Sequence, residues 1–169
     1  GIVLARGTWI NFMNAGDRFY NSRVLSDIFF QDYAKAFLIY GNAICVEGSK
    51  RWVQVQANRH KNKIKSIIHQ TMFYRRCLLN KNPFDTTFRV MADYDHLRAT
   101  LNESSKHILH KDLIVCFYDR GGISSKPLFT YFYEFFTIAR IRLTPCWLLF
   151  FIFYYIPRLL VSLMRNKRN

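Results

Sequence analysis

The sequence predicts an α/β domain followed by an apolar, basic C-terminal tail, and three observations predict this. Short apolar runs rich in strand-forming residues alternate with segments of helical periodicity over residues 1–126. Half of the 169 residues are hydrophobic and 17% are aromatic, which is enough for a sizeable core. From Pro127 onward the composition shifts to Phe, Tyr, Leu and Ile with scattered Arg and Lys. We therefore expect a domain over 1–126 and a separate segment over 127–169.

The sequence of the first part of the domain predicts two buried strands, a helix and a hairpin. A strand over 9–13 runs into turn-forming residues, and apolar residues at helical spacing follow a predicted N-cap at Ser22. Residues 36–41 form the second predicted strand. The hairpin is predicted over 43–56, with its turn at Gly48-Ser49 between two β-rich arms.

The sequence of the second part of the domain predicts two helices and a strand. The basic stretch 59–65 leads into 66–81, the second part of which is helical in pattern. A further helix is predicted over 91–104, with acidic residues in its first turn, where the helix dipole favours them. Residues 112–125 predict a strand that ends in a Gly-Gly loop.

The tail over 127–169 is expected to meet lipid. Residues 146–164 are about long enough to span a bilayer, but Pro157-Arg158 interrupts them and basic residues flank both sides. This pattern favours interfacial or re-entrant membrane-associated helices over a transmembrane span. An oligomer interface, or a helix packed on the domain, is the alternative for the same residues.

A formal net charge of +14 indicates an anionic partner, either a membrane surface or nucleic acid. Only the charge supports nucleic acid, because no interleaved aromatic residues of an RNA-reading sheet accompany the basic stretch. We therefore expect a membrane surface and no nucleic acid. The four cysteines lack the spacing of a zinc site, which indicates reduced thiols in the core.

Three features in a suggestive order mark a candidate site. Asp17 follows a strand, Asp93 and Asp95 begin a helix, and Gly121-Gly122 follow a strand. In open α/β sheets, ligands gather beyond the carboxyl ends of strands. A carboxylate there suits a hard cation, a carboxylate at a helix start suits a general base, and a Gly-rich loop can close over a phosphate. Taken singly, each feature also has an ordinary explanation as a turn or a helix cap.

Four segments resemble, in order, blocks of the family 2 glycosyltransferases. They are "GIVLARGTWINFMNAGDRFYNSRVLSDIF", "SIIHQTMFYRRCLL", "NPFDTTFRVMADYDHLRATL" and "CFYDRGGISSKP". The resemblance is strongest to bacterial transferases of exopolysaccharide, colanic-acid and O-antigen assembly, and it covers residues 1–126. It implies a GT-A fold, with a mixed sheet flanked by helices. It also implies inverting transfer of a sugar from a nucleotide-sugar to a saccharide or lipid-linked acceptor, at the cytoplasmic face of the bacterial inner membrane.

The resemblance also implies roles for individual residues. Asp17 falls on the last acid of the metal motif and would help to hold Mg²⁺ or Mn²⁺, while Asp93 falls on the catalytic base. The other residues implied to line the substrate site are Asn14, His69, Gln70, Asp95, Arg98, Gly121, Gly122 and Ser124.

The chain departs from the family pattern in two ways. Asn14 and Gly16 stand where the metal motif usually carries acids, so a single carboxylate of that motif remains. The strand and nucleotide pocket that begin the family's domain are expected to precede "GIVLARG". The alternative hypothesis is therefore a truncated, inactive homologue that serves as a membrane-associated partner protein.

Overall fold

The computed structural model describes residues 1–56, 67–104, 107–121 and 129–138 of the chain. The chain divides into two compact units, 1–125 and 126–169, beside the composition shift at Pro127. The first unit contains the sheet and every candidate site residue that the structure describes.

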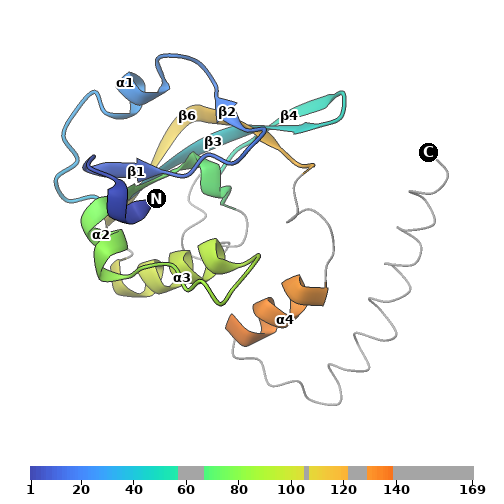
Figure 1. Ribbon diagram of the computed structural model, residues 1–169. Coiled ribbons are helices and arrows are strands. Elements are labelled where there is room, and N and C mark those ends of the chain that lie inside the picture. Colours follow the sequence, from blue (N-terminus) through green and yellow to red (C-terminus); the bar gives the residue numbers. More distant parts are fainter. Residues whose placement is uncertain (57–66, 105–106, 122–128, 139–169) are drawn as a thin grey trace. The chain divides into compact units, whose positions relative to one another are not determined.

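The first unit is built on one six-stranded mixed sheet (Figure 1). Its strands are β1 (Trp9–Asn11), β2 (Arg18–Phe19), β3 (Leu38–Glu47), β4 (Lys50–Gln54), β5 (Met72–Arg75) and β6 (Ile108–Asp119). The strand order is β1-β5-β3-β6-β2, with β4 also paired to β3. The central pair β3–β6 is parallel and the other pairs are antiparallel. The predicted α/β class is confirmed, and so is the mixed sheet with flanking helices.

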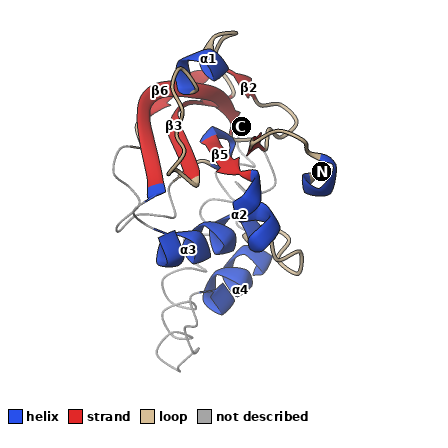
Figure 2. Ribbon diagram, turned by 90° about the vertical axis from the view of Figure 1, so that its left-hand side faces the viewer, coloured by secondary structure: helices blue, strands red, loops and turns tan. Residues whose placement is uncertain are grey.

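Helices cover both faces of this sheet, and alternating residues of β3 contact them. Ile39 packs in a cluster with Val24 and Ile28 of α1 (Val24–Ile28). Its neighbours Leu38 and Tyr40 pack in a second cluster with residues of α2 (Arg76–Lys81) and α3 (Ala92–Ser104). Because successive strand residues point to opposite faces, α1 lies on one side and α2 and α3 on the other, as Figure 2 shows.

Strand β3 approaches β6 very closely at Gly41. A Cβ atom at Gly41 would lie 2.6 Å from Cγ2 of Val115 and 2.7 Å from the carbonyl oxygen of Leu113. The register of the β3–β6 pair also shifts between Tyr40 and Ala43, which marks a bulge. A side chain at position 41 would force the two central strands apart, so glycine is required there.

Several predicted elements are confirmed and others need correction. The hairpin with its turn at Gly48-Ser49 and the helix over 91–104 are both present. The predicted cap at Ser22 is wrong, because α1 begins after Arg23 and has no side-chain cap. Sequence analysis missed β2 and β5, because strands of two and four residues give too short a pattern.

The cysteines follow the prediction in part. Cys45 and Cys116 are free and buried, as expected for core thiols, and burial together with the charge of Asp17 raises the pKa of Cys116 to about 12. Cys77 is free but exposed on α2, which corrects its assignment to the core.

The second unit contributes one described helix, α4 (Phe129–Ile138), of 10 residues. Among the residues that the structure describes, no helix has both the length and the apolar character needed to cross a bilayer. The helices expected over 146–164 lie outside the described residues.

Candidate functional site

Asp17 ends the turn that connects β1 to β2, and both of its carboxylate oxygens are engaged. The turn is closed by the backbone N–H of Asp17, which donates to the carbonyl oxygen of Asn14 at 3.1 Å. Oδ1 of Asp17 accepts from the backbone N–H of Asp119 at 2.7 Å, at the end of β6. Oδ2 accepts from Nε2 of Gln70 at 2.8 Å. Three segments far apart in sequence therefore fix the orientation of this carboxylate.

The turn itself depends on a glycine. Gly16 has a φ of 93°, a conformation that side chains other than glycine rarely adopt. A Cβ atom there would also lie 3.3 Å from Oδ2 of Asp119. Gly16 thus allows Asp119 to lie directly against the turn.

His69 and Gln70 lie in a short 3-10 helix, η3 (His69–Thr71), immediately before β5. Asn11 of β1 fixes this segment, because its Nδ2 donates to the carbonyl oxygens of Gln70 (2.9 Å) and Met72 (2.8 Å). The side chain of Gln70 is buried and extends to Asp17. The position of η3 is therefore set by the edge strand that leads to Asp17.

Asp93 lies in the first turn of α3, beside His69. The distance from Nδ1 of His69 to Oδ2 of Asp93 is 4.0 Å, and the Asp93 side chain is 45% exposed. The same nitrogen of His69 lies 3.2 Å from the hydroxyl of Tyr74, which is fully buried. Two consecutive residues thus lie beside the two predicted site carboxylates, His69 beside Asp93, the predicted base, and Gln70 against Asp17, the predicted metal ligand.

Asp93 lies beside a group of rings, the histidine cluster, made up of the buried His96 and Tyr74 and the partly buried His69, Phe12 and Phe84. The rings of Phe84 and His96 lie 4.5 Å apart, and Phe12 contacts both His69 and Phe84 at 5.4 Å between centroids. Nε2 of His96 lies 2.8 Å from the carbonyl oxygen of Asn82, so this nitrogen must carry the proton. Nδ1 of His96 is buried and has no hydrogen-bond partner among the described residues.

The histidine cluster keeps both imidazoles neutral. Burial lowers the pKa of His69, although the nearby charge of Asp93 acts in the opposite direction. Burial also lowers the pKa of His96. For that ring, the bond to Asn82 and the charge of Asp95 oppose the shift, while His69 adds to it. A proton on either ring would lie in an apolar environment, so the neutral forms are favoured.

We expect this cluster to make the fold sensitive to mild acid. In the folded state, the pKa values of the two histidines lie below the ordinary value of about 6.5. Once the pH falls below that value, the unfolded chain therefore binds more protons than the folded chain does. The free energy of unfolding should therefore decrease between pH 7 and 5, as measured by urea denaturation at each pH. His96→Gln should weaken this dependence, whereas the exposed His107→Gln should not. An identical pH dependence in both variants would contradict the role of His96.

A divalent cation at Asp17 is compatible with the residues present. Each oxygen of Asp17 accepts one hydrogen bond, and a carboxylate oxygen has a second lone pair available for a metal. The described residues contain no group of three acidic, His or Cys side chains that could hold a metal by themselves. Mg²⁺ is commonly held by one or two carboxylates together with substrate phosphates, so Asp17 fits a cation shared with a diphosphate.

The structure groups some predicted site residues and leaves others apart. Asn14 is exposed in the turn before Asp17, and Asp95 and Arg98 lie half-buried along α3. The backbone N–H of Gly121 donates to Oδ1 of Asp119 at 2.8 Å, which brings the start of the predicted loop to the same corner as Asp17. The other two predicted loop residues, Gly122 and Ser124, lie outside the described residues.

Sequence analysis missed four residues that shape this site, namely Asn11, Tyr74, His96 and Asp119. A signal existed for Asp119, because it stands between a strand-like run and the Gly-Gly pair, as Asp17 stands after its own strand. Asn11, Tyr74 and His96 give no such signal, since their roles depend on pairing and packing between distant segments.

Comparison with known proteins finds curated relatives of this chain but no family model. No protein-family model matches the chain. The PGL/p-HBAD biosynthesis glycosyltransferases of Mycobacterium bovis and Mycobacterium tuberculosis are each 29% identical to it over 129 residues. The matched region covers 74% of this chain and 50% of each relative. Both relatives are named as glycosyltransferases. The chain spans about half their length, and the similarity supports a relationship to glycosyltransferases.

Proposed function

We propose that this chain belongs to an inverting, metal-assisted glycosyltransferase of family 2 with a GT-A fold. The single observation that supports this most strongly is the link through η3, where Gln70 contacts Asp17 and His69 lies beside Asp93. A sugar transferase needs a site for the departing diphosphate and a base for the acceptor hydroxyl, held at a fixed separation. Two consecutive residues that contact both carboxylates would provide such a fixed separation.

Asp93 is proposed as the base. Its carboxylate is half-exposed and so accessible to an acceptor, and it lies beside a histidine that burial keeps neutral. The acceptor oxygen forms a bond to the anomeric carbon while the bond from that carbon to the diphosphate oxygen breaks. Asp93 takes the hydroxyl proton in the same step. A single displacement of this kind inverts the configuration at the anomeric carbon.

Asp17 is proposed to hold Mg²⁺ or Mn²⁺ together with the donor diphosphate. When bound there, the cation would supply positive charge to the phosphate oxygens of the leaving group. Gln70 and the backbone N–H of Asp119 would keep the Asp17 carboxylate in one orientation before the donor arrives.

The proposed acceptor is a saccharide or a lipid-linked saccharide at the cytoplasmic membrane face. Support comes from the net charge of +14, which favours an anionic surface, and from the apolar, basic composition of 127–169. The relatives are named as glycosyltransferases of PGL/p-HBAD biosynthesis, so they too are assigned to a biosynthetic pathway.

Calorimetric titration of UDP and GDP into this chain tests the donor site. We expect metal-dependent heat with at least one nucleotide when Mn²⁺ is present. Asp17→Asn keeps one of the two acceptor oxygens and removes the charge, and it should weaken binding about tenfold, as expected for loss of a charge-assisted contact. Asp27→Asn, an exposed carboxylate in α1, is the matched control and should bind as the unmodified chain does.

The second candidate function is an inactive homologue that acts as a membrane-associated partner protein. It is favoured by Asn14 and Gly16, which stand where the metal motif of family 2 usually carries acids. It predicts no heat with UDP, GDP or their sugar conjugates, with or without Mn²⁺, in a chain whose folding is verified by circular dichroism. That result would reject a donor site in this chain.

A further inference from the structure

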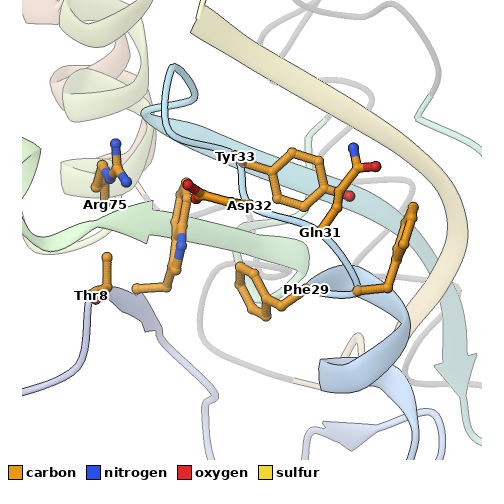
Figure 3. Close-up of a pocket in the computed structure, with 8 residues that line it drawn as sticks. Thr8, Phe29, Gln31, Asp32, Tyr33 and Arg75 are labelled. Atoms are coloured by element: carbon orange, nitrogen blue, oxygen red, sulfur yellow. The ribbon is translucent and has the colours of Figure 1, made fainter.

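A pocket of about 460 Å³ lies on the first unit, and Figure 3 shows the residues that line it. It is lined by the four aromatic residues Trp9, Phe29, Phe30 and Tyr33 and by the four polar residues Thr8, Gln31, Asp32 and Arg75. Its volume falls within the range of roughly 300–1,000 Å³ that is typical of small-ligand sites. No role in the proposed sugar transfer accounts for it.

The register of β1 and β5 separates this pocket from the candidate catalytic site. Trp9 pairs with Arg75 at one end of the two strands, and both residues line the pocket. At the other end, Asn11 pairs with Phe73 and holds the segment that leads to Gln70 and Asp17. A ligand in the pocket would therefore lie at the opposite end of the β1–β5 pair from Asp17.

The aromatic wall of the pocket is anchored in the core. The rings of Trp9 and Phe29 lie 5.6 Å apart, and Phe29 meets the buried Phe73 edge-on at 5.4 Å. Phe30 is different, because it is 68% exposed and adds an accessible ring at the rim. The pocket therefore combines a rigid apolar wall with one ring that is open to a ligand.

The two cations near the pocket already have partners. The guanidinium carbon of Arg75 lies 5.4 Å from the Trp9 ring, and Nη1 of Arg75 donates to the carbonyl oxygen of Ala34. The ammonium nitrogen of Lys111 lies 4.8 Å from the Phe30 ring and 4.7 Å from the Tyr33 ring. Both cations are therefore held against the aromatic walls of the pocket, and phosphate serves as the comparison that tests for anion binding.

The polar groups that remain available are neutral or negative. Within the described part of the chain, the side chains of Thr8, Gln31 and Asp32 make no hydrogen bond. The hydroxyl of Tyr33 likewise lacks a partner there, but it is buried and so is not exposed to a ligand. A carboxylate, an amide and a hydroxyl beside aromatic rings suit a ligand with many hydroxyl groups and an apolar face.

We propose that the pocket formed by Trp9, Phe30, Asp32 and their neighbours binds a saccharide. The apolar face of a pyranose ring would stack on Phe30 and the aromatic wall, and its hydroxyls would donate to Asp32 and exchange hydrogen bonds with Gln31 and Thr8. This site is additional to the donor and acceptor sites of the proposed function and does not depend on them.

Proton–nitrogen NMR spectra of the labelled chain test the site through the indole N–H of Trp9. The probes are the methyl α-glycosides of glucose, galactose and mannose, with inorganic phosphate as the comparison. We expect a saturable shift of the Trp9 signal with at least one glycoside, in the millimolar range, and none with phosphate. The signal is assigned by its loss in Trp9→Phe.

Two variants, Asp32→Ala and Phe30→Ala, show whether binding uses the proposed groups, and Asp27→Ala is their control. Asp32→Ala removes the charged acceptor and should weaken binding about tenfold, whereas the exposed Asp27→Ala should not. Phe30→Ala removes an exposed ring, so it should spare the fold and weaken binding severalfold.

Three results would overturn the saccharide site. They are the absence of any shift at tens of millimolar glycoside, a shift with phosphate alone, and equal affinity in both variants and the unmodified chain. Because the readout involves neither a nucleotide nor Asp93, this outcome is separate from that of the transferase proposal.

Discussion

Replacing Asp93 with Asn should lower sugar transfer by about a hundredfold to ten-thousandfold, the range expected for loss of a general base. The amide keeps the size and the hydrogen-bonding oxygen of the carboxylate, so the contact with the backbone N–H of Tyr94 at 2.7 Å can persist. It cannot take a proton from an acceptor hydroxyl. The measurement is kcat in any form of the protein that transfers sugar, with the melting temperature recorded alongside.

Two controls make the Asp93 result specific. Asp27→Asn removes an exposed carboxylate from the first turn of α1 and should leave kcat unchanged. His69→Gln removes the ring that lies 4.0 Å from Asp93 and should change the pH dependence of kcat, because the environment of the base changes. Normal turnover by Asp93→Asn in a folded protein would show that another group is the base.

Each of the two carboxylates has a local signal in the sequence. Asp17 ends the turn that follows the apolar strand β1, and Asp93 lies in the acidic first turn of a helix, which is visible in the letters themselves. Their placement on elements of one α/β sheet follows from the alternation of strands and helices. Such features depend on neighbouring residues and can be seen without the fold.

The link between those carboxylates could not be predicted in the same way. The bond from Gln70 to Asp17 joins residues 53 positions apart, and the bond from the Asp119 backbone to Asp17 joins residues 102 apart. Both depend on how β5 and β6 enter the sheet, and β5 itself has only four residues. A polar residue just before a short apolar strand gives no indication of its distant partner.

A buried hydrogen-bond network around Gln56 shows this limit most clearly. Nε2 of Gln56 donates to the carbonyl oxygen of Gly41 and, at 3.0 Å, to the hydroxyl of Thr71, while its Oε1 accepts from the backbone N–H of Ile68. Its own backbone N–H donates to Oδ1 of Asn42 at 2.8 Å. One fully buried amide thus joins the central strand β3 to the segment that carries His69 and Gln70.

Gln56→Leu should therefore destabilise the fold strongly. Leucine fits the space but leaves the Ile68 N–H, the Gly41 carbonyl and the Thr71 hydroxyl without this partner in a dry interior. Each unsatisfied buried group costs about 1–3 kcal/mol, so a loss on the order of 3 kcal/mol or more is expected. Urea denaturation measures the free energy of unfolding directly.

The matched control for this network is Gln54, the last residue of β4, two residues before Gln56. Gln54 is half-exposed, and its Oε1 makes only a long contact of 3.6 Å with the thiol of Cys45, so Gln54→Leu should change stability little. If the two substitutions cost the same, the amide of Gln56 would not be what holds 68–71 against β3. If only Gln56→Leu is destabilising, it should also weaken nucleotide binding in the presence of Mn²⁺, because the orientation of Asp17 depends on the position of Gln70. The structural network and the proposed donor site would then be connected through η3.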